Sequence, residues 1–84
     1  MTYNISRQQL GNNITRARLK RKLSQTVLAA LCGWHQERQC KMEAGKYNLT
    51  LQTLNILADA LRVPVRDFFQ LAWKNSGQDN GKTP

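Results

Sequence analysis

The side chains with the greatest capacity for chemistry lie between Gly33 and Gly45, in the stretch GWHQERQCKMEAG. Residues 36 to 43 contain two glutamines, two glutamates, an arginine and a lysine. Glutamine donates and accepts hydrogen bonds, whereas arginine and lysine only donate and carboxylates only accept. On a helix, these side chains could form a polar face that binds a surface patterned with donors and acceptors. The alternative is an ordinary face turned to solvent.

The same stretch does not assemble a catalytic or metal site. His35 is the only histidine in the chain, and Cys32 and Cys40 are the only cysteines. Their spacing matches neither a CxxC nor a zinc pattern, and no clustered carboxylates accompany them. We therefore expect no enzyme, no metal and no cofactor. We also expect reduced thiols in a cytoplasm, with a disulfide or redox switch as the open alternative.

Positive charge is concentrated in the first half of the chain. The formal charge of the 84 residues is +8, and nine of the 13 Lys and Arg residues precede Asn48 with only two of the five acidic residues. Five of these cations lie in RARLKRK, residues 16 to 22. The asymmetry favours a polyanionic partner, most commonly nucleic acid. No apolar run reaches the roughly 18 residues of a membrane span, so we expect a soluble, cytoplasmic protein without a membrane partner.

Helical periodicity and capping residues predict five short helices and no strand. The expected helices cover about residues 7–21, 25–32, 36–43, 51–61 and 65–73, with Ser6, Ser24 and Thr50 as N-terminal caps and Gly33 and Gly45 as stops. A short buried segment is predicted from Val27, Leu28 and Leu31, and an apolar stripe is formed by Leu51, Leu54, Leu57, Ala58 and Leu61. Residues 75 to 84 contain no large apolar side chain and predict a disordered tail. We expect one domain, residues 1 to 74.

The second and third expected helices, separated by a glycine turn, have the size of a helix-turn-helix. The third could therefore lie in the DNA major groove, where base edges present donors and acceptors. Arg38 or Lys41 could donate to guanine, Gln36 could pair with adenine, and Glu37 could accept from cytosine.

The order of residues from about Leu10 to Phe69 resembles the Cro/C1-type (XRE) helix-turn-helix family. The matching residues, at the family spacing, are Ile14, Arg18, Leu23, Ser24, Gln25, Leu28, Ala29, Gly33, Glu43, Gly45, Leu54, Leu57, Ala58 and Leu61. The resemblance implies an all-α, five-helix, lambda-repressor-like domain. The text YNLTLQTLNILADALRV, residues 47 to 63, is also similar to restriction-modification controller proteins, a dimeric subgroup.

The resemblance implies roles for individual side chains. The base-contacting residues of the recognition helix would be Gln36, Glu37, Arg38 and Lys41. Phosphate contacts are expected from Gln25, Thr26, Lys46, Tyr47 and Asn48, and from Arg16 in the basic run. Gln25 would also brace the first residue of the recognition helix. Arg18 and Glu43 would form a structural ion pair between the first and third helices.

Three positions depart from the family pattern. Gln39 stands where the family has an apolar residue that wedges the recognition helix into the core, which would allow a rotated or loosely held helix. His35 replaces a Ser or Thr cap and is a poorer one. Lys22 stands where many members have glycine. These departures affect the expected contacts more than the expected fold.

The predicted function is a transcription regulator, a repressor or dual regulator, that binds a palindromic double-stranded DNA operator as a homodimer. Two-fold symmetry would place two recognition helices in successive major grooves about 34 Å apart. Apolar residues expected at the dimer interface are Phe68, Phe69, Leu71 and Trp73. One alternative is an antitoxin-type protein-interaction module that also binds DNA. Another is a basic protein of membrane surfaces or RNA.

Overall fold

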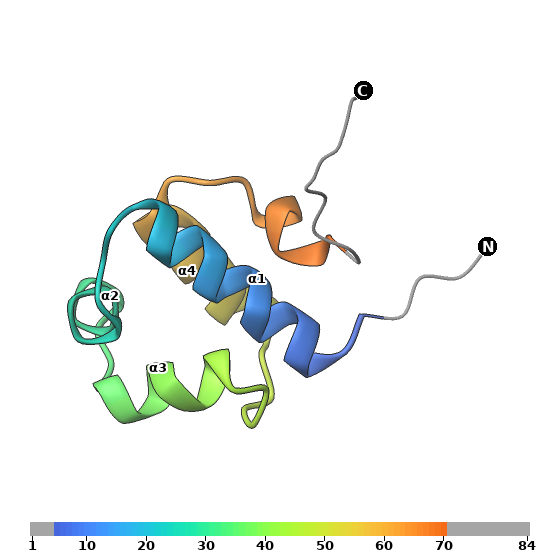
Figure 1. Ribbon diagram of the computed structural model, residues 1–84, viewed down its shortest axis with the longest axis horizontal. Coiled ribbons are helices and arrows are strands. Elements are labelled where there is room, and N and C mark those ends of the chain that lie inside the picture. The colour runs from blue at the N-terminus through green and yellow to red at the C-terminus, as the bar shows by residue number, and fades with distance from the viewer. Residues whose placement is uncertain (1–4, 71–84) are drawn as a thin grey trace.

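The computed structural model describes residues 5 to 70 (Figure 1). Its elements are α1 (Arg7–Lys20), α2 (Gln25–Cys32), α3 (Gln36–Glu43), α4 (Leu51–Leu61) and a 3-10 helix, η1 (Val65–Phe69). The all-α prediction is confirmed, and the first four helices begin and end within a residue of the expected bounds. The fifth element differs, because it is a short 3-10 helix rather than an α-helix. The expected tail, residues 75 to 84, lies outside the described residues.

The helices pack around a central pair. In Figure 1, α1 crosses in front of α4, α2 and α3 lie at one side of this pair, and η1 lies at the other. Helix α3 contacts both α1 and α2, whereas η1 contacts α1 and α4. Helix α3, which the sequence predicts to be the recognition helix, therefore forms one side of the domain. One of its faces packs against α1 and α2, and the opposite face points outward.

Local hydrogen bonds define where the helices start. The side-chain oxygens of Ser6, Ser24 and Thr50 accept bonds from the backbone N–H groups three residues further on. His35 makes no such bond at the start of α3, as expected for a poor cap. A side-chain cap contributes about 1 kcal/mol, so α3 depends more than the other α-helices on tertiary contacts.

Left-handed residues end the helices. Gly33 and Gly45 have φ values of 86° and 76°, which glycine adopts without a steric penalty. Lys22 and Arg62 also have φ values of 58°, although each carries a Cβ. At Lys22 the backbone closes α1 with a bond from the Leu23 N–H to the Arg18 carbonyl. The positive φ at this position explains why glycine suits it in many members of the family that the sequence resembles. In this chain, a lysine adopts the same conformation.

Every helix contributes residues to the hydrophobic core. The outer face of α2 is not part of it. The buried residues of the core are Leu10, Ile14, Ala17, Leu28, Met42, Leu54, Leu57, Ala58, Leu61 and Phe68. The prediction that Val27 and Leu31 are buried was wrong, because these side chains are 47% and 61% exposed. Leu51, in the first turn of α4, is also 64% exposed although it belongs to the apolar stripe. Helices α3 and α4 cover only the side of α2 that carries Leu28 and Ala29, which leaves its other apolar side bare.

Two close contacts hold α3 and η1 against α1. A Cβ at Gly11 would lie 2.5 Å from the carbonyl oxygen of Glu43, so the backbones of α1 and α3 touch there. The buried Asn13 side chain donates to the carbonyl oxygens of Phe68 and Gln70, at 2.7 and 2.9 Å. Neither contact was predicted from the order of residues. Among residues 5 to 70, no helix combines the length and the apolar character that crossing a membrane requires.

Candidate nucleic-acid interface

The outward face of α3 carries three of the four residues predicted to contact bases. Gln36, Glu37 and Lys41 are exposed. Lys41 Nζ lies 3.7 Å from a carboxylate oxygen of Glu37, one helical turn earlier. An exposed pair of this kind contributes little to stability, so both side chains are available to a partner. The arrangement offers an amide, a carboxylate and an ammonium group along one ridge.

Gln39 lies inside the domain. The expectation that all the polar side chains of this helix form one outward face was therefore wrong. Its side chain is fully buried, and its Nε2 donates to Glu43 Oε2 at 2.8 Å. Its Oε1 accepts from the indole Nε1 of Trp34 at 2.9 Å. Because both ends of the amide are hydrogen-bonded, burial costs little despite the polarity. The expectation of a rotated or loose helix was wrong, since Gln39 anchors α3 by hydrogen bonds in place of an apolar wedge.

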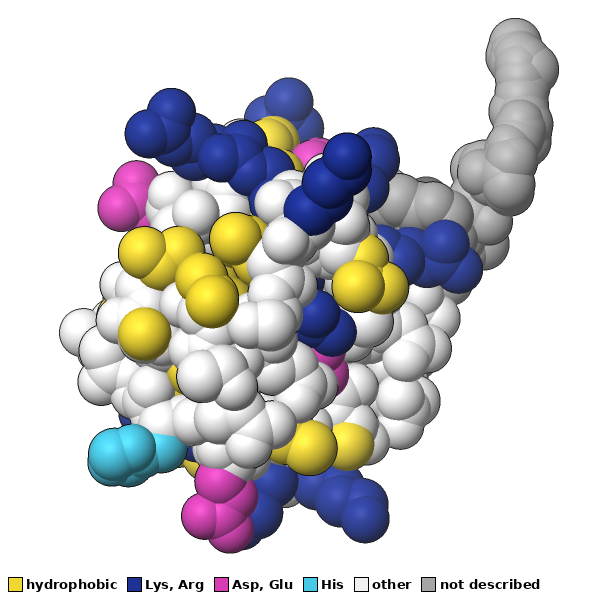
Figure 2. Space-filling model, turned by 60° about the vertical axis from the view of Figure 1, so that its left-hand side comes forward, with side chains coloured by type: hydrophobic (Ala, Val, Ile, Leu, Met, Phe, Trp, Pro, Cys, Tyr) yellow, Lys and Arg dark blue, Asp and Glu magenta, His cyan; other side chains and the backbone are white. Residues whose placement is uncertain are grey.

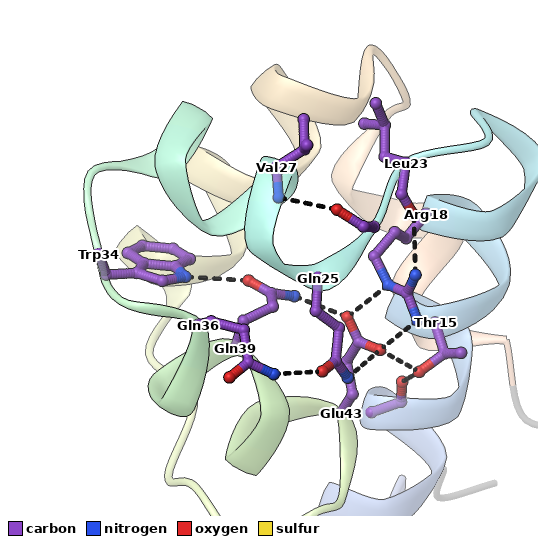
Figure 3. Close-up of polar contacts among 11 residues, drawn as sticks. Thr15, Arg18, Leu23, Gln25, Val27, Trp34, Gln36, Gln39 and Glu43 are labelled. Carbon is purple, nitrogen blue, oxygen red and sulfur yellow. Dashed lines mark hydrogen bonds and ion pairs between the residues drawn. The ribbon is translucent and has the colours of Figure 1, made fainter.

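The carboxylate of Glu43 is the centre of this network (Figure 3). The guanidinium of Arg18 donates to both of its oxygens at 2.9 Å, and Thr15 lies 2.9 Å away and Gln25 3.1 Å away. Burial alone would raise the pKa of Glu43, but the bonds from Arg18, Gln39, Gln25 and Thr15 outweigh it and hold the pKa below its usual value. The carboxylate is therefore ionised at neutral pH.

The network extends to the outward face through Gln25. Its Nε2 donates to Glu43, and its Oε1 accepts from Nε2 of Gln36 at 2.8 Å. Figure 3 shows the side chains of Gln25 and Gln36 meeting between the first turns of α2 and α3. Gln36, the first residue of α3, is thus braced from α2, as the family resemblance implied.

Arg38 lies apart from the other predicted base contacts. Its Cζ is 4.3 Å from the centroid of the Trp34 ring and 5.1 Å from that of Tyr47, within the range of cation–π attraction. One of its terminal nitrogens lies 3.5 Å from Thr53 Oγ1, and its buried Nε has no hydrogen-bond partner. The guanidinium thus ties α3 to the loop before α4. Sequence spacing places Arg38 near the ridge but does not reveal two aromatic rings beside it.

These aromatic residues also border an open hollow of about 390 Å³ at the edge of α3. Its lining residues are Gly33, Trp34, His35, Glu37, Arg38, Lys41 and Tyr47. The hollow adjoins the exposed ridge, and both cationic and aromatic groups line it. The loop before α4 therefore borders the same surface as the exposed side of α3.

The residues predicted to contact phosphates lie on three elements. Thr26 lies exposed in the first turn of α2, Lys46 and Asn48 lie exposed in the loop between α3 and α4, and Tyr47 is half-buried there. Gln25 is half-buried in the network, and Arg16 is exposed on α1. Figure 2 shows Lys and Arg side chains gathered at two ends of the face that carries α2, with hydrophobic side chains between them.

The residues predicted for the dimer interface do not form one exposed group. Phe68 is fully buried in the core of its own chain, so its assignment to an interface was wrong. The 3-10 helix turns this ring inward and leaves Phe69 42% exposed. Leu71 and Trp73 lie outside the described residues.

Both cysteines carry free thiols. Burial raises the pKa of the Cys32 thiol to about 11, and the nearby charge of Arg38 offsets only part of this effect. Because the thiolate is the reactive form, Cys32 is poorly reactive at neutral pH. Cys40 is exposed on α3.

A model of the family described as helix-turn-helix domain matches residues 9 to 68. The search of curated proteins finds no match. Among solved structures, the restriction-modification controller protein C.AhdI from Aeromonas hydrophila is 30% identical, with a TM-score of 0.72. The match covers 75% of this chain and 96% of that protein.

Two further structures share the fold at lower identity. The hypothetical transcription factor NHTF from Neisseria is 23% identical, with a TM-score of 0.73 over 83% of this chain and 88% of its own. The clp gene regulator ClgR from C. glutamicum is 20% identical, with a TM-score of 0.73 over 77% of this chain and 84% of its own.

Proposed function

The chain belongs to the Cro/C1-type (XRE) helix-turn-helix family, and on that premise we propose that it is a sequence-specific transcription regulator that binds a palindromic DNA operator as a homodimer. Its likeness to a restriction-modification controller protein and to other regulators supports this proposal. The protein acts in the cytoplasm, where it represses transcription or has a dual role. Neither catalysis nor a cofactor enters the proposed activity.

The outward ridge of α3 is the observation that supports the proposal most directly. A helix of eight residues is held against the domain by a buried network while Gln36, Glu37 and Lys41 remain exposed. Base edges in the major groove present the complementary donors and acceptors. In this arrangement Gln36 contacts adenine, Lys41 contacts guanine, and Glu37 accepts from cytosine.

The surrounding polar residues supply phosphate contacts. Lys46 and Asn48 follow the recognition helix, Thr26 lies at the start of α2, and Arg16 lies on α1. Gln25 and Tyr47 complete the set from half-buried positions. Such contacts position the helix on the duplex without reading sequence, and their charge makes affinity depend on salt.

Arg38 contacts a base only after its guanidinium leaves the rings of Trp34 and Tyr47. The lack of a partner for its buried Nε lowers the cost of that movement. Arg38→Ala tests the assignment, because loss of a base contact relaxes preference at one base step by about 1 to 3 kcal/mol. Equal loss on specific and random duplexes instead assigns Arg38 to holding the loop.

The homodimer is supported by large apolar side chains left partly uncovered. Phe69 on η1 and Ile56 on α4 are both exposed, although each could be buried against a second copy. A two-fold dimer presents two recognition helices, which explains why the operator would be palindromic.

An antitoxin-type protein-interaction module that also binds DNA is the second candidate. The bare apolar side of α2, with Val27 and Leu31 exposed, favours it because such a surface suits a protein partner. Purification from the native cell distinguishes the two, since an antitoxin would be isolated with a second polypeptide in fixed ratio.

Selection from a random duplex pool at two salt concentrations tests the main proposal. We expect a reproducible, two-fold-symmetric consensus whose half-sites lie one helical turn apart. The affinity should fall as salt rises, while the consensus stays the same. Enrichment of no sequence, or equal affinity for all duplexes, would contradict a sequence-specific regulator.

A further inference from the structure

A second hollow, of about 240 Å³, lies where the C-terminal ends of α1 and α4 meet η1. Its lining residues, which define the α1–η1 hollow, are Asn13, Ala17, Lys20, Arg21, Leu61, Arg62, Val63 and Asp67. None of them belongs to α2 or α3, and Figure 1 shows η1 on the side of the α1–α4 pair opposite to those helices. The α1–η1 hollow is therefore separate from the exposed ridge of α3.

The apolar residues of the α1–η1 hollow are held in place by the core. Leu61 is fully buried, Ala17 is 8% exposed, and Val63 is half-buried. The buried side chain of Asn13 ties α1 to the end of η1, because it donates to two backbone carbonyl oxygens there at 2.7 and 2.9 Å. A hollow with fixed walls needs little ordering when a ligand enters, which lowers the cost of binding.

Three cations and one carboxylate share the hollow with these apolar residues. Lys20, Arg21 and Arg62 are exposed, and Asp67 is half-buried. Within residues 5 to 70, none of these four side chains takes part in an ion pair or a side-chain hydrogen bond. Opposite charges thus line one hollow without pairing with each other. A ligand that carries both charges can bind to both.

Arg62 has an unfavourable backbone conformation for its residue type. It ends α4 with a φ value of 58°, a left-handed conformation that glycine adopts without a steric penalty. A cation here also suits the negative end of the helix dipole, but that effect needs only a charge near the last carbonyl groups. It does not require a strained residue at the edge of a hollow. Strained residues of this kind cluster at functional sites.

We propose that the α1–η1 hollow binds a small amino acid with an apolar side chain. The carboxylate of the ligand pairs with the three cations, its ammonium group pairs with Asp67, and its side chain contacts the apolar residues. Hydrogen bonds between ionised groups are among the stronger ones in proteins. Pockets for drug-sized ligands have volumes of roughly 300 to 1,000 Å³, so the smaller α1–η1 hollow suits a ligand smaller than a nucleotide.

This inference goes beyond the proposed function, because the α1–η1 hollow and the ridge of α3 share no residue. A ligand in the hollow contacts α1, the end of α4 and η1 together. It therefore binds the folded chain and not the unfolded one, and it raises the unfolding temperature by mass action. Binding can thus be measured without DNA.

The test titrates the full chain with alanine, valine and leucine at constant ionic strength. We expect at least one of them to raise the unfolding temperature saturably, with a dissociation constant on the order of 1 mM. The same ligand should shift the methyl NMR signals of Ala17 and Val63. Two matched probes then remove one charge each, 4-methylpentanoate and 3-methylbutylamine in the case of leucine. Each should bind about tenfold more weakly than the amino acid.

Three variants locate the binding. Arg62→Gly removes one cation and relieves the left-handed strain, so it should fold at least as well as wild type and bind the amino acid about tenfold more weakly. Asp67→Asn should abolish the preference for the amino acid over the acid that lacks the amino group. Arg66→Gln, which changes an exposed cation on η1 outside the hollow, should leave binding unchanged.

Several results would overturn the proposal. The first is that none of the three amino acids shifts the signals of Ala17 and Val63. Equal binding by wild type and folded Arg62→Gly, or equal binding of the amino acid and the acid without its amino group, also contradicts it. Equal losses in Arg66→Gln and Arg62→Gly would indicate general attraction to a basic protein. A chain that binds the amino acid but prefers no DNA sequence would overturn the proposed function alone.

Discussion

Arg18 on α1 and Glu43 on α3 form a two-point ion pair, with Nε and Nη2 of the guanidinium each 2.9 Å from a different carboxylate oxygen. The third nitrogen, Nη1, donates to the Leu23 carbonyl at 2.8 Å, just before α2. One side chain thus joins α1, the start of α2 and the end of α3. The planar guanidinium suits this role because its donors have a fixed geometry.

Arg18→Met should destabilise the domain strongly. The change leaves the buried Glu43 carboxylate without its cation, and breaking a buried pair from one side costs about 3 kcal/mol or more. Denaturant unfolding measures the loss. Lys20→Met, an exposed cation on the same helix, should change stability by less than about 0.5 kcal/mol. Similar losses in both variants would mean that the pair is not structurally important.

Acid should destabilise the protein through Glu43. Its pKa is lower in the folded state than the ordinary value of 4.5, so the unfolded chain binds more protons as pH falls. The stabilisation is complete above about 4.5 and is lost as pH falls through the folded-state pKa. The free energy of unfolding, measured from pH 7 to pH 3, should fall in wild type. In Glu43→Gln the slope should be shallower, and an unchanged slope would assign the effect to other groups.

Gln39 and Trp34 should be energetically coupled. Gln39→Leu leaves the indole N–H and the Glu43 carboxylate each short of one partner, at a cost of about 1 to 3 kcal/mol. Trp34→Phe removes the same indole bond from the other side. The double variant should therefore cost about 1 kcal/mol less than the sum of the single changes. Strict additivity in a double-mutant cycle would show that the bond contributes nothing.

Gly11→Ala and Gly33→Ala should differ in severity. A methyl group at Gly11 would press on the backbone of Glu43 and Met42 at 2.5 and 2.7 Å and force α1 and α3 apart, at a cost of about 3 kcal/mol. Gly33 has open space around it, so alanine there meets only the penalty of a positive φ, about 1 kcal/mol. Thermal unfolding compares the two, and a milder effect at Gly11 would contradict the close packing of α1 and α3.

Lys22→Gly should stabilise the fold and weaken DNA binding at once. Glycine relieves the left-handed conformation of Lys22, which should raise stability by about 1 kcal/mol. Loss of one exposed cation should lower affinity on all duplexes alike and reduce the salt dependence. Lys22→Ala keeps the positive φ, so it should share the binding loss without the gain in stability. A gain in stability in both variants would contradict the explanation that glycine acts by relieving the positive φ of Lys22.

Local chemistry explains why much of the fold could be predicted from the sequence. The caps at Ser6, Ser24 and Thr50 bond to groups three residues away, and Gly33 ends α2 in a conformation that glycine favours. Such interactions need no distant partner, so the bounds of α1 to α4 follow from the order of residues. The exposed positions of Gln36, Glu37 and Lys41 agree with the expected ridge because they share one outward side of a short helix.

Burial of a particular side chain depends instead on which element covers it. Helical spacing groups Val27 and Leu31 with buried residues, but no neighbour covers that side of α2. The Gln39 amide could enter the core only because Trp34 and Glu43 supply opposite hydrogen-bonding partners there. Likewise, Arg38 turns from the ridge because the ring of Tyr47, from another element, lies within cation–π range.

The sequence by itself therefore determined α1 to α4 and their ends, since these depend on interactions within a few residues. Tertiary structure alone decided which polar side chains of α3 face inward and how the outward ones are held. Those outcomes depend on partners brought together from α1, α2 and the loop before α4. A hydrogen bond or ring contact between distant segments forms only when packing has placed both groups within a few ångströms.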